Sequence, residues 1–190
     1  NVPVVGGEIT DYSRVEAIIP SLKELINRKN KIFIIAHYGR PNGTINESLS
    51  ISFLCKILEQ KLNVSKIHFL NTIDNEEIAK KLNELDFGDV CLIENIRFYK
   101  EEETNETAFS SKLSNNFEIY INDAFSASHR NHSSIVGLPK FLPSYAGYSF
   151  VKEINNLNNF LKKRRKPNLA ILGGSKISTK IRVIYNLINL

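Results

Sequence analysis

The 190-residue sequence contains no methionine, no tryptophan and only two cysteines. Cys55 and Cys91 each lie inside an apolar segment, so we expect both to be buried, reduced residues of the core. Two such thiols are too few for a disulfide scaffold, and their apolar setting disfavours a metal pair. The cysteine usage therefore indicates a cytosol-like compartment.

Long apolar runs are also absent. No stretch approaches the roughly 18 residues of a membrane span, and no charged-then-apolar leader opens the chain. We therefore expect a cytoplasmic, unexported chain with no membrane partner. The lack of methionine and the abrupt start at Asn1-Val2-Pro3 predict a fragment of a longer protein.

The composition is that of a globular chain with a modest basic excess. At 42% hydrophobic residues, the chain is long enough for one full core and the start of a second. The net charge of +5 and the pI near 9.1 favour anionic partners. Charge alone does not separate a metabolite from a nucleic acid.

Strand-like and helix-like periods alternate through the first two thirds of the chain. Short apolar runs predict strands at residues 31–36, 67–70, 90–93 and 119–121. Apolar stripes at helical spacing predict helices within residues 15–26, 51–62, 78–85 and 109–113. Repeated strand-helix units of this length imply right-handed crossovers and a doubly wound parallel α/β sheet.

Local signals suggest where these helices begin. Pro20 predicts a kink or a late start of the first helix, and Ser48 or Ser50 is available to cap the second. Thr72 or Asp74 is expected to cap the third. The acidic residues 101–103 lie near the positive end of the fourth.

Three arginines follow strand-like runs within a few residues. Arg40, Arg97 and Arg130 come after the first, third and fourth of these runs. The carboxyl ends of the strands in an open α/β sheet face the ligand crevice, so these loops can bring several guanidinium groups together. Such a cluster suits a small anion with phosphate or carboxylate oxygens. Each arginine taken alone reads better as a solvated surface residue.

The last third of the chain changes character. Phe150, Ile154, Leu157 and Leu161 predict an amphipathic helix that ends in the basic run 162–166. This run could bind nucleic acid or act as a targeting signal, but we prefer a solvated helix terminus closed by Pro167. A further strand at residues 169–172 and a helix bearing Ile177 to Ile188 predict the first unit of a second domain.

The turn Gly173-Gly174-Ser175-Lys176 joins that strand to that helix. Two glycines let the backbone approach a ligand, and amides at a helix start favour an anion. Lys176 and Lys180 lie four residues apart, so both can reach one phosphate. The spacing is neither that of a P-loop nor that of the dinucleotide fingerprint, and tight strand-to-helix packing is the alternative.

Together these segments carry a resemblance to the phosphoglycerate kinase family along the whole chain. The resemblance lies in an ordered set of motifs: Asn1-Val2-Pro3 with Gly7, Ile9 and Asp11; Arg14; Ala36-His37-Tyr38-Gly39-Arg40-Pro41; Glu94-Asn95-Ile96-Arg97-Phe98; Asn122-Asp123-Ala124-Phe125; His129-Arg130-Asn131-His132; and Gly173 through Lys180. It implies two Rossmann-like domains that close by hinge bending in a glycolytic, ATP-binding transferase. Its reaction would be reversible phosphoryl transfer between ATP and 3-phosphoglycerate, giving 1,3-bisphosphoglycerate and ADP.

The resemblance also implies the roles of particular residues. The glycerate site would comprise Asn1, Arg14, His37, Arg40, Arg97 and Arg130, with Arg14 at the carboxylate end where transfer occurs. Gly173, Gly174, Lys176 and Lys180 would lie on the nucleotide side, with Arg14, Lys176 and Lys180 catalytic. His129 and His132 are expected to orient the Arg130 loop through hydrogen bonds.

The resemblance further predicts the domain organisation. Residues 1–148 would form the 3-phosphoglycerate-binding domain without its first strand, residues 149–166 an interdomain helix, and residues 167–190 the truncated start of the nucleotide domain. The magnesium ligands would then lie beyond Leu190, with no metal ligand in this chain. We expect a monomer that acts on small molecules and not on nucleic acid, and a fragment that is inactive by itself.

Other classes of protein fit parts of the pattern. A truncated, non-catalytic anion-binding module would keep the arginines but have no use for Lys176 and Lys180. A nucleic-acid-binding domain would use residues 162–166, but its basic residues are not interleaved with a surface aromatic pattern. A Rossmann dehydrogenase shares the layers but would need the missing fingerprint.

Overall fold

The computed structural model describes residues 2–6, 8–162, 171 and 181–188. It divides into two compact units, Asn1–Val151 and Lys152–Leu190. The predicted strand at 169–172, the Gly173-Gly174 turn and most of the basic run fall outside the described residues, apart from Ile171 and Lys162. The predicted domain limits at residues 148 and 166 stay a prediction.

Parallel strands form the centre of the first unit. A three-stranded sheet has the order β3 (Ile32–Ile34), β5 (Val90–Ile93) and β4 (His68–Leu70), all parallel. β6 (Tyr120–Asn122) and β7 (Ser144–Ala146) form a second parallel pair, and β1 (Val4–Val5) and β2 (Glu8–Ile9) an antiparallel one. The parallel α/β class is confirmed, in two parallel sheets rather than one, because no described pairing joins β3 to β6.

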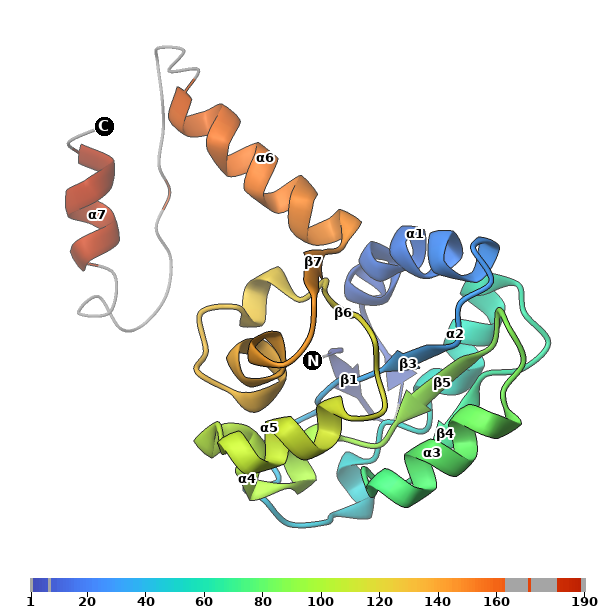
Figure 1. Cartoon of the computed structure of the whole chain (residues 1–190). Helices are drawn as coiled ribbons and strands as arrows, with labels where there is room; N and C mark the ends of the chain where they lie inside the picture. The colour runs from blue at the N-terminus through green and yellow to red at the C-terminus, as the bar shows by residue number, and fades with distance from the viewer. Residues whose placement is uncertain (1, 7, 163–170, 172–180, 189–190) are drawn as a thin grey trace. The chain divides into compact units, whose positions relative to one another are not determined.

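The central strand β5 is buried on both faces. Val90 and Leu92 pack with α1 (Ser13–Asn27) and α2 (Leu54–Leu62) in one core cluster. Cys91 and Ile93 pack with α3 (Asn75–Glu84) and α5 (Thr107–Ser114) in the other. Successive strand side chains point to opposite faces, so one continuous apolar run serves both cores. Figure 1 shows the helices on both sides of this sheet, as the predicted double winding requires.

The helix boundaries differ in part from the sequence prediction. α1 contains Pro20 in its interior instead of beginning there. Neither predicted serine caps α2, whose N-cap is Phe53; the Ser50 hydroxyl instead donates to Glu94 Oε2 at 2.7 Å. Asp74 does cap α3, accepting a hydrogen bond from the Glu76 amide at 2.9 Å. Its short side chain satisfies an amide that the helix start leaves unpaired.

The fourth predicted helix is α5, and a separate short helix, α4 (Lys100–Thr104), precedes it. α4 ends at Asn105, whose φ of 55° is left-handed, and α5 follows it. Short helical segments also lie in the loops of the first unit: Glu47–Leu49, Ile96–Phe98, Phe125–Ala127, Ser133–Gly137 and Leu138–Lys140. The acidic residues 101–103 therefore belong to a short helix of their own, directly after Arg97.

The amphipathic helix predicted near residue 150 is α6 (Tyr148–Lys162), and α7 (Ile181–Ile188) follows in the second unit. Both thiols are free, with Cys91 buried and Cys55 half-buried. Burial raises the pKa of Cys91 to about 12 and that of Cys55 to about 11, so neither is a reactive thiolate. Within the described chain, no helix combines the length and apolarity needed to cross a membrane.

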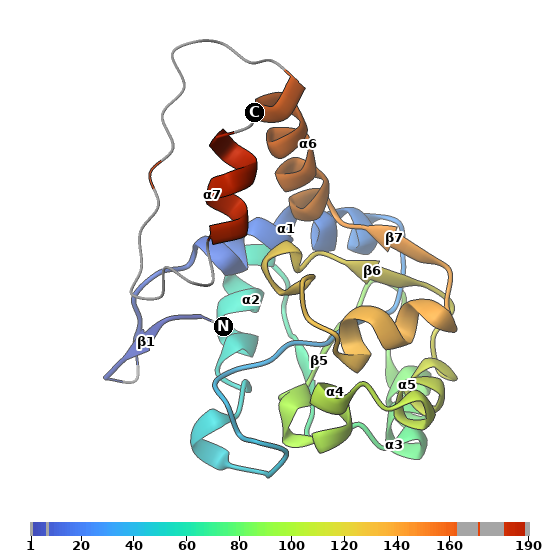
Figure 2. The same ribbon diagram turned by 90° about the vertical axis from the view of Figure 1, so that its left-hand side faces the viewer.

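A buried polar contact ties the start of α6 to α1 and to the loop after β6. The Ser21 hydroxyl donates to Asp123 Oδ2 at 2.6 Å and accepts from the Tyr148 amide at 2.9 Å. Asp123 Oδ1 accepts from the Phe150 amide at 2.9 Å. These bonds satisfy amides of the first turn of α6 and fix Asp123, which lies in one of the motifs noted in the sequence. Figure 2 shows β6, β7 and the start of α6 beside α1.

We expect Ser21→Ala to destabilise the fold. The change removes both hydrogen bonds of a hydroxyl that is 9% exposed and leaves the Tyr148 amide without an acceptor. The loss should be about 1–3 kcal/mol in the free energy of unfolding. Urea denaturation of the purified protein measures it, with the exposed Ser65→Ala as the control. An equal effect of both variants would contradict a structural role for this contact.

Candidate anion-binding site

The loops at the carboxyl ends of β3, β5 and β6 carry the predicted anion ligands. His37 and Arg40 follow β3, which ends at Ile34, and Arg97 lies in the turn after β5. Arg130 follows the helical turn after β6. Parallel strands point the same way, so their carboxyl ends meet at one edge of the fold.

Arg97 is the most deeply buried of these cations. Its exposure is 2%, and its Nη1 donates to the Gly39 carbonyl at 3.1 Å. Its Nε lies 3.3 Å from Glu103 Oε1, but neither Nε nor Nη2 has a hydrogen-bond partner among the described residues. Buried donors are rarely left unpaired, because each loses its bonds to water. A buried guanidinium with open donors is therefore suited to bind an oxyanion.

The electrostatics indicate that the other two arginines lie near Arg97. Burial lowers the pKa of Arg97, and the charge of Arg130 and, more weakly, that of Arg40 lower it further, while Glu103 and Glu102 oppose the shift. Mutual repulsion of this kind is felt only over short distances in a screened medium. The charges of Arg130 and Arg40 are thus both felt at Arg97, and an anion bound among the three would relieve this repulsion.

His37 lies in the same cluster and is neutral at physiological pH. Burial lowers the pKa of His37 to about 3, with further contributions from the positive charges of Arg97 and Arg130 and from His132. The half-buried imidazole can therefore donate or accept a hydrogen bond beside an anion without adding charge.

Buried Asn95 holds the two main site loops together. Its Nδ2 donates to the carbonyls of Tyr38 at 2.7 Å and Leu49 at 2.9 Å. Its Oδ1 accepts from the Arg97 amide at 3.2 Å, so one side chain ties the β3 loop to the β5 loop. Between them Gly39 has φ +65°, and a Cβ there would lie 2.7 Å from Leu49 Cδ2. The left-handed φ and this close approach therefore favour glycine at this point.

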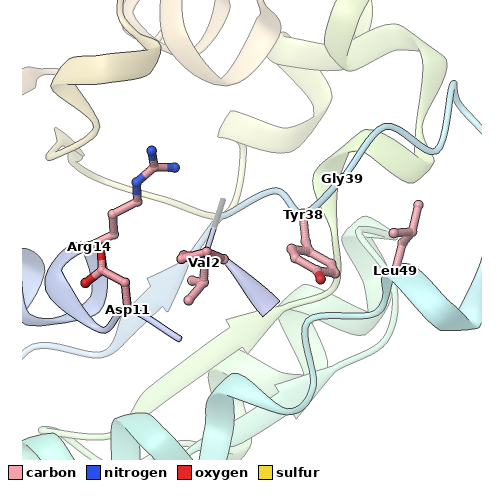
Figure 3. Close-up of a pocket in the computed structure, with 7 residues that line it drawn as sticks. Val2, Asp11, Arg14, Tyr38, Gly39 and Leu49 are labelled. Carbon is pink, nitrogen blue, oxygen red and sulfur yellow. The ribbon is translucent and has the colours of Figure 1, made fainter. Parts of the chain in front are cut away.

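Arg14 lies beside this loop, at the start of α1. It lines an open pocket of about 380 Å³ together with Val2, Pro3, Asp11, Tyr38, Gly39 and Leu49. Figure 3 shows its side chain extending away from the Asp11 carboxylate, with Tyr38 and Gly39 across Val2. Arg14 and Gly39 thus line the same pocket, and the Gly39 carbonyl also accepts a hydrogen bond from Arg97 Nη1.

The remaining predicted ligands cannot be placed. Asn1, Gly173, Gly174, Lys176 and Lys180 lie outside the described residues. Their assignment to the glycerate and nucleotide sides stays a prediction.

Sequence reasoning missed the carboxylates and amides behind the arginines. Residues 101–103 read only as charges near a helix start, whereas Glu103 faces Arg97 and Glu102 is 2% exposed. Asn95 was part of a motif without an assigned role. The sequence could have indicated these residues only by their closeness to Arg97, from which they lie two to six positions away. Which way their side chains point depends on how α4 packs.

The family model described as Phosphoglycerate kinase matches residues 1–190. The chain belongs to this family. The phosphoglycerate kinase of Wolbachia pipientis wMel is 43% identical over 187 residues, covering 98% of this chain and 46% of that protein. That of Sinorhizobium fredii is 40% identical over 188 residues, covering 99% and 47%.

Solved phosphoglycerate kinase structures share the fold. The enzyme from Coxiella burnetii has a TM-score of 0.83 and 30% identity, covering 100% of this chain and 47% of that one. The enzyme from Pyrococcus horikoshii has a TM-score of 0.88 and 28% identity, covering 100% and 48%. The chain spans about half the length of these relatives, and its Rossmann-like α/β architecture is that of the phosphoglycerate kinase family.

We expect His37 to make the fold less stable in mild acid. Its pKa is about 3 in the folded protein and about 6.5 when unfolded, so between these values the unfolded state binds more protons. Stability therefore falls as pH falls below about 6.5, and at pH 5 the loss is about 2 kcal/mol.

Urea unfolding at pH 7 and pH 5 measures this loss. His37→Gln should reduce the difference between the two pH values, whereas the exposed His129→Gln should keep it. An unchanged difference in His37→Gln would mean that His37 does not carry the acid sensitivity.

Proposed function

We propose that the protein containing this chain transfers a phosphoryl group reversibly between ATP and the carboxyl group of 3-phosphoglycerate. The products are 1,3-bisphosphoglycerate and ADP, as in glycolysis. The supporting observation is the buried Arg97 guanidinium, whose Nε and Nη2 lack partners among the described residues while Arg130 and Arg40 act on it. The match to the phosphoglycerate kinase family supports 3-phosphoglycerate as the anion that this cluster binds.

In this proposal the arginine cluster binds the phosphate that is not transferred. Arg40, Arg97 and Arg130 grip its oxygens, and neutral His37 adds a hydrogen bond. Arg14, beside the Gly39 turn, meets the carboxylate end, and Asn1 completes the glycerate site. Guanidinium forks suit this task because they present paired donors in the geometry of phosphate oxygens.

Fixed charge supplies most of the catalysis in such a transfer. The transferred group spreads negative charge over its equatorial oxygens, and positioned cations stabilise that charge. The attacking carboxylate is already ionised at neutral pH, so no general base is required. The lowered pKa of His37 supports a binding role for it, since the ring stays neutral near pH 7.

The nucleotide side of the proposal rests on residues 173–180. Gly173 and Gly174 would let the backbone approach a phosphate, with Lys176 and Lys180 contributing charge and Lys180 acting on the group in flight. No group of three or more histidine, cysteine or acidic side chains in the described parts of the chain could hold a metal ion. The proposal therefore assigns Mg²⁺ to no residue described here. We further propose a cytoplasmic monomer.

Arg130→Ala tests the glycerate site in the intact protein. Losing one charged hydrogen-bonding partner should raise the KM for 3-phosphoglycerate about 10- to 100-fold while the KM for ATP stays unchanged. Steady-state kinetics with Mg²⁺ and ATP provide the measurement, and Arg28→Ala, an exposed arginine at the end of α1, is the matched control. Loss of folding, or no change in KM for 3-phosphoglycerate, would contradict the assignment.

Lys180→Ala separates transfer from binding. Its charge is proposed to act most strongly during transfer, so kcat should fall far more than the KM of either substrate rises. The same kinetic assay reports both quantities. Equal weakening of ground-state binding and turnover would instead make Lys180 an ordinary binding residue.

A further inference from the structure

The short helix α4 lies between Arg97 and Arg130 in the sequence and contacts Arg97 as well as the segment that follows Arg130. It begins three residues after Arg97, and its residues hold the segment 131–134 that directly follows Arg130. Asn105, at its end, donates from Nδ2 to Asn131 Oδ1 at 2.9 Å. The Glu101 carbonyl accepts from the Ser133 hydroxyl at 2.8 Å.

Glu102 makes the strongest of these contacts. Glu102 is 2% exposed, and its carboxylate accepts from the Ser134 amide at 2.8 Å and from the Ser134 hydroxyl at 2.6 Å. His132 Nδ1 lies 3.5 Å from Glu102 Oε1. Burying a carboxylate is unfavourable unless hydrogen bonds replace its water, and here a single residue of the Arg130 loop supplies two of them.

The neighbouring residue Glu103 turns toward the other arginine. Its Oε1 lies 3.3 Å from Arg97 Nε. Successive residues of a helix point about 100° apart, so two adjacent carboxylates can face different partners. One turn of α4 thus contacts Arg97 on one side and the Ser134 end of the Arg130 loop on the other.

Further hydrogen bonds hold Arg97 and Ser134, the two partners of α4. Arg97 is held by the Gly39 carbonyl, and the Ser134 carbonyl accepts from the Tyr120 hydroxyl at 2.7 Å. Tyr120 is itself half-buried, and its burial, with a smaller effect of Glu102, raises its pKa to about 12. The phenol therefore stays protonated and keeps donating to Ser134 at any ordinary pH.

We propose that Glu102 is a positioning residue for substrate phosphate. By holding Ser134, it sets the place of the Arg130 guanidinium relative to Arg97, so that both can bind the same phosphate group. It acts through hydrogen-bond geometry rather than through its charge, which near a cationic site would weaken anion binding. This inference rests on the proposed function.

Three variants of the intact protein test the hydrogen-bond link. Glu102→Ala removes both hydrogen bonds to Ser134, so it should raise the KM for 3-phosphoglycerate about five- to tenfold, within the range for networked residues. Ser134→Ala removes only the bond from the hydroxyl and keeps the one from the amide, so its KM should rise less, about two- to fivefold. The kcat and the KM for ATP should change less than about twofold. Glu102→Gln keeps the shape and can still pair with both Ser134 groups, so its KM should remain near the original value.

The background variant Arg130→Ala separates positioning from mere stability. There, Ser134→Ala and Glu102→Ala should raise the KM no further, because the group that they position is gone. Glu77→Gln, on the exposed surface of α3, serves as the carboxylate control, and thermal unfolding of every variant is measured alongside. Ser134→Ala keeps the test valid if Glu102→Ala fails to fold.

Other outcomes would contradict a positioning role for Glu102 or the proposed function. If Glu102→Gln raises the KM as much as Glu102→Ala although it keeps hydrogen bonds to Ser134, those bonds do not position Arg130 and the proposal fails. If Ser134→Ala lowers only thermal stability, or if the effects persist fully in the Arg130→Ala background, Glu102 is not a positioning residue. If Arg130→Ala alone leaves the KM for 3-phosphoglycerate unchanged, the proposed function fails instead.

Discussion

The candidate site depends on a guanidinium group that is buried without being fully paired. Arg97 is 2% exposed, next to two other arginines, and two of its nitrogens lack hydrogen-bond partners among the described residues. Such an arrangement is unfavourable by itself, since a buried charge loses its hydration and like charges repel. Hydrogen bonds hold Arg97 there, from its amide to Asn95 and from its Nη1 to the Gly39 carbonyl. A bound anion would supply the missing partners and offset the repulsion.

The surrounding residues show how that position is imposed. Asn95 ties the Arg97 amide to the Tyr38 and Leu49 carbonyls, and the Glu94 carboxylate accepts from the Ile51 amide at 3.0 Å and from the Ser50 hydroxyl. Glu94 and Asn95 directly follow Ile93, the last residue of the apolar strand β5. Buried hydrogen bonds therefore preorganise the Arg97 part of the site, whereas Arg40 is exposed.

The strands of the sheet were predicted from the sequence more successfully than the helix caps. The apolar run at residues 90–93 predicted a strand of the parallel sheet, and β5 confirms it. Cap prediction was less successful, because Ser50 had a stronger partner in Glu94, 44 residues away in sequence, than in the start of α2. The same limit applies to Glu102, whose partner Ser134 lies 32 residues away. A local pattern does not contain such distant competitors.

The sequence alone determined the class of the chain, since apolar periods and ordered motifs are local properties that need no tertiary contact to be read. It also identified the three arginines, because each follows a strand and parallel strands end at one edge. Only the tertiary structure decided which arginine is buried, that His37 is held neutral, and which carboxylates face the cluster. Burial and charge proximity depend on how α4 and the loops pack together, so no stretch of sequence states them.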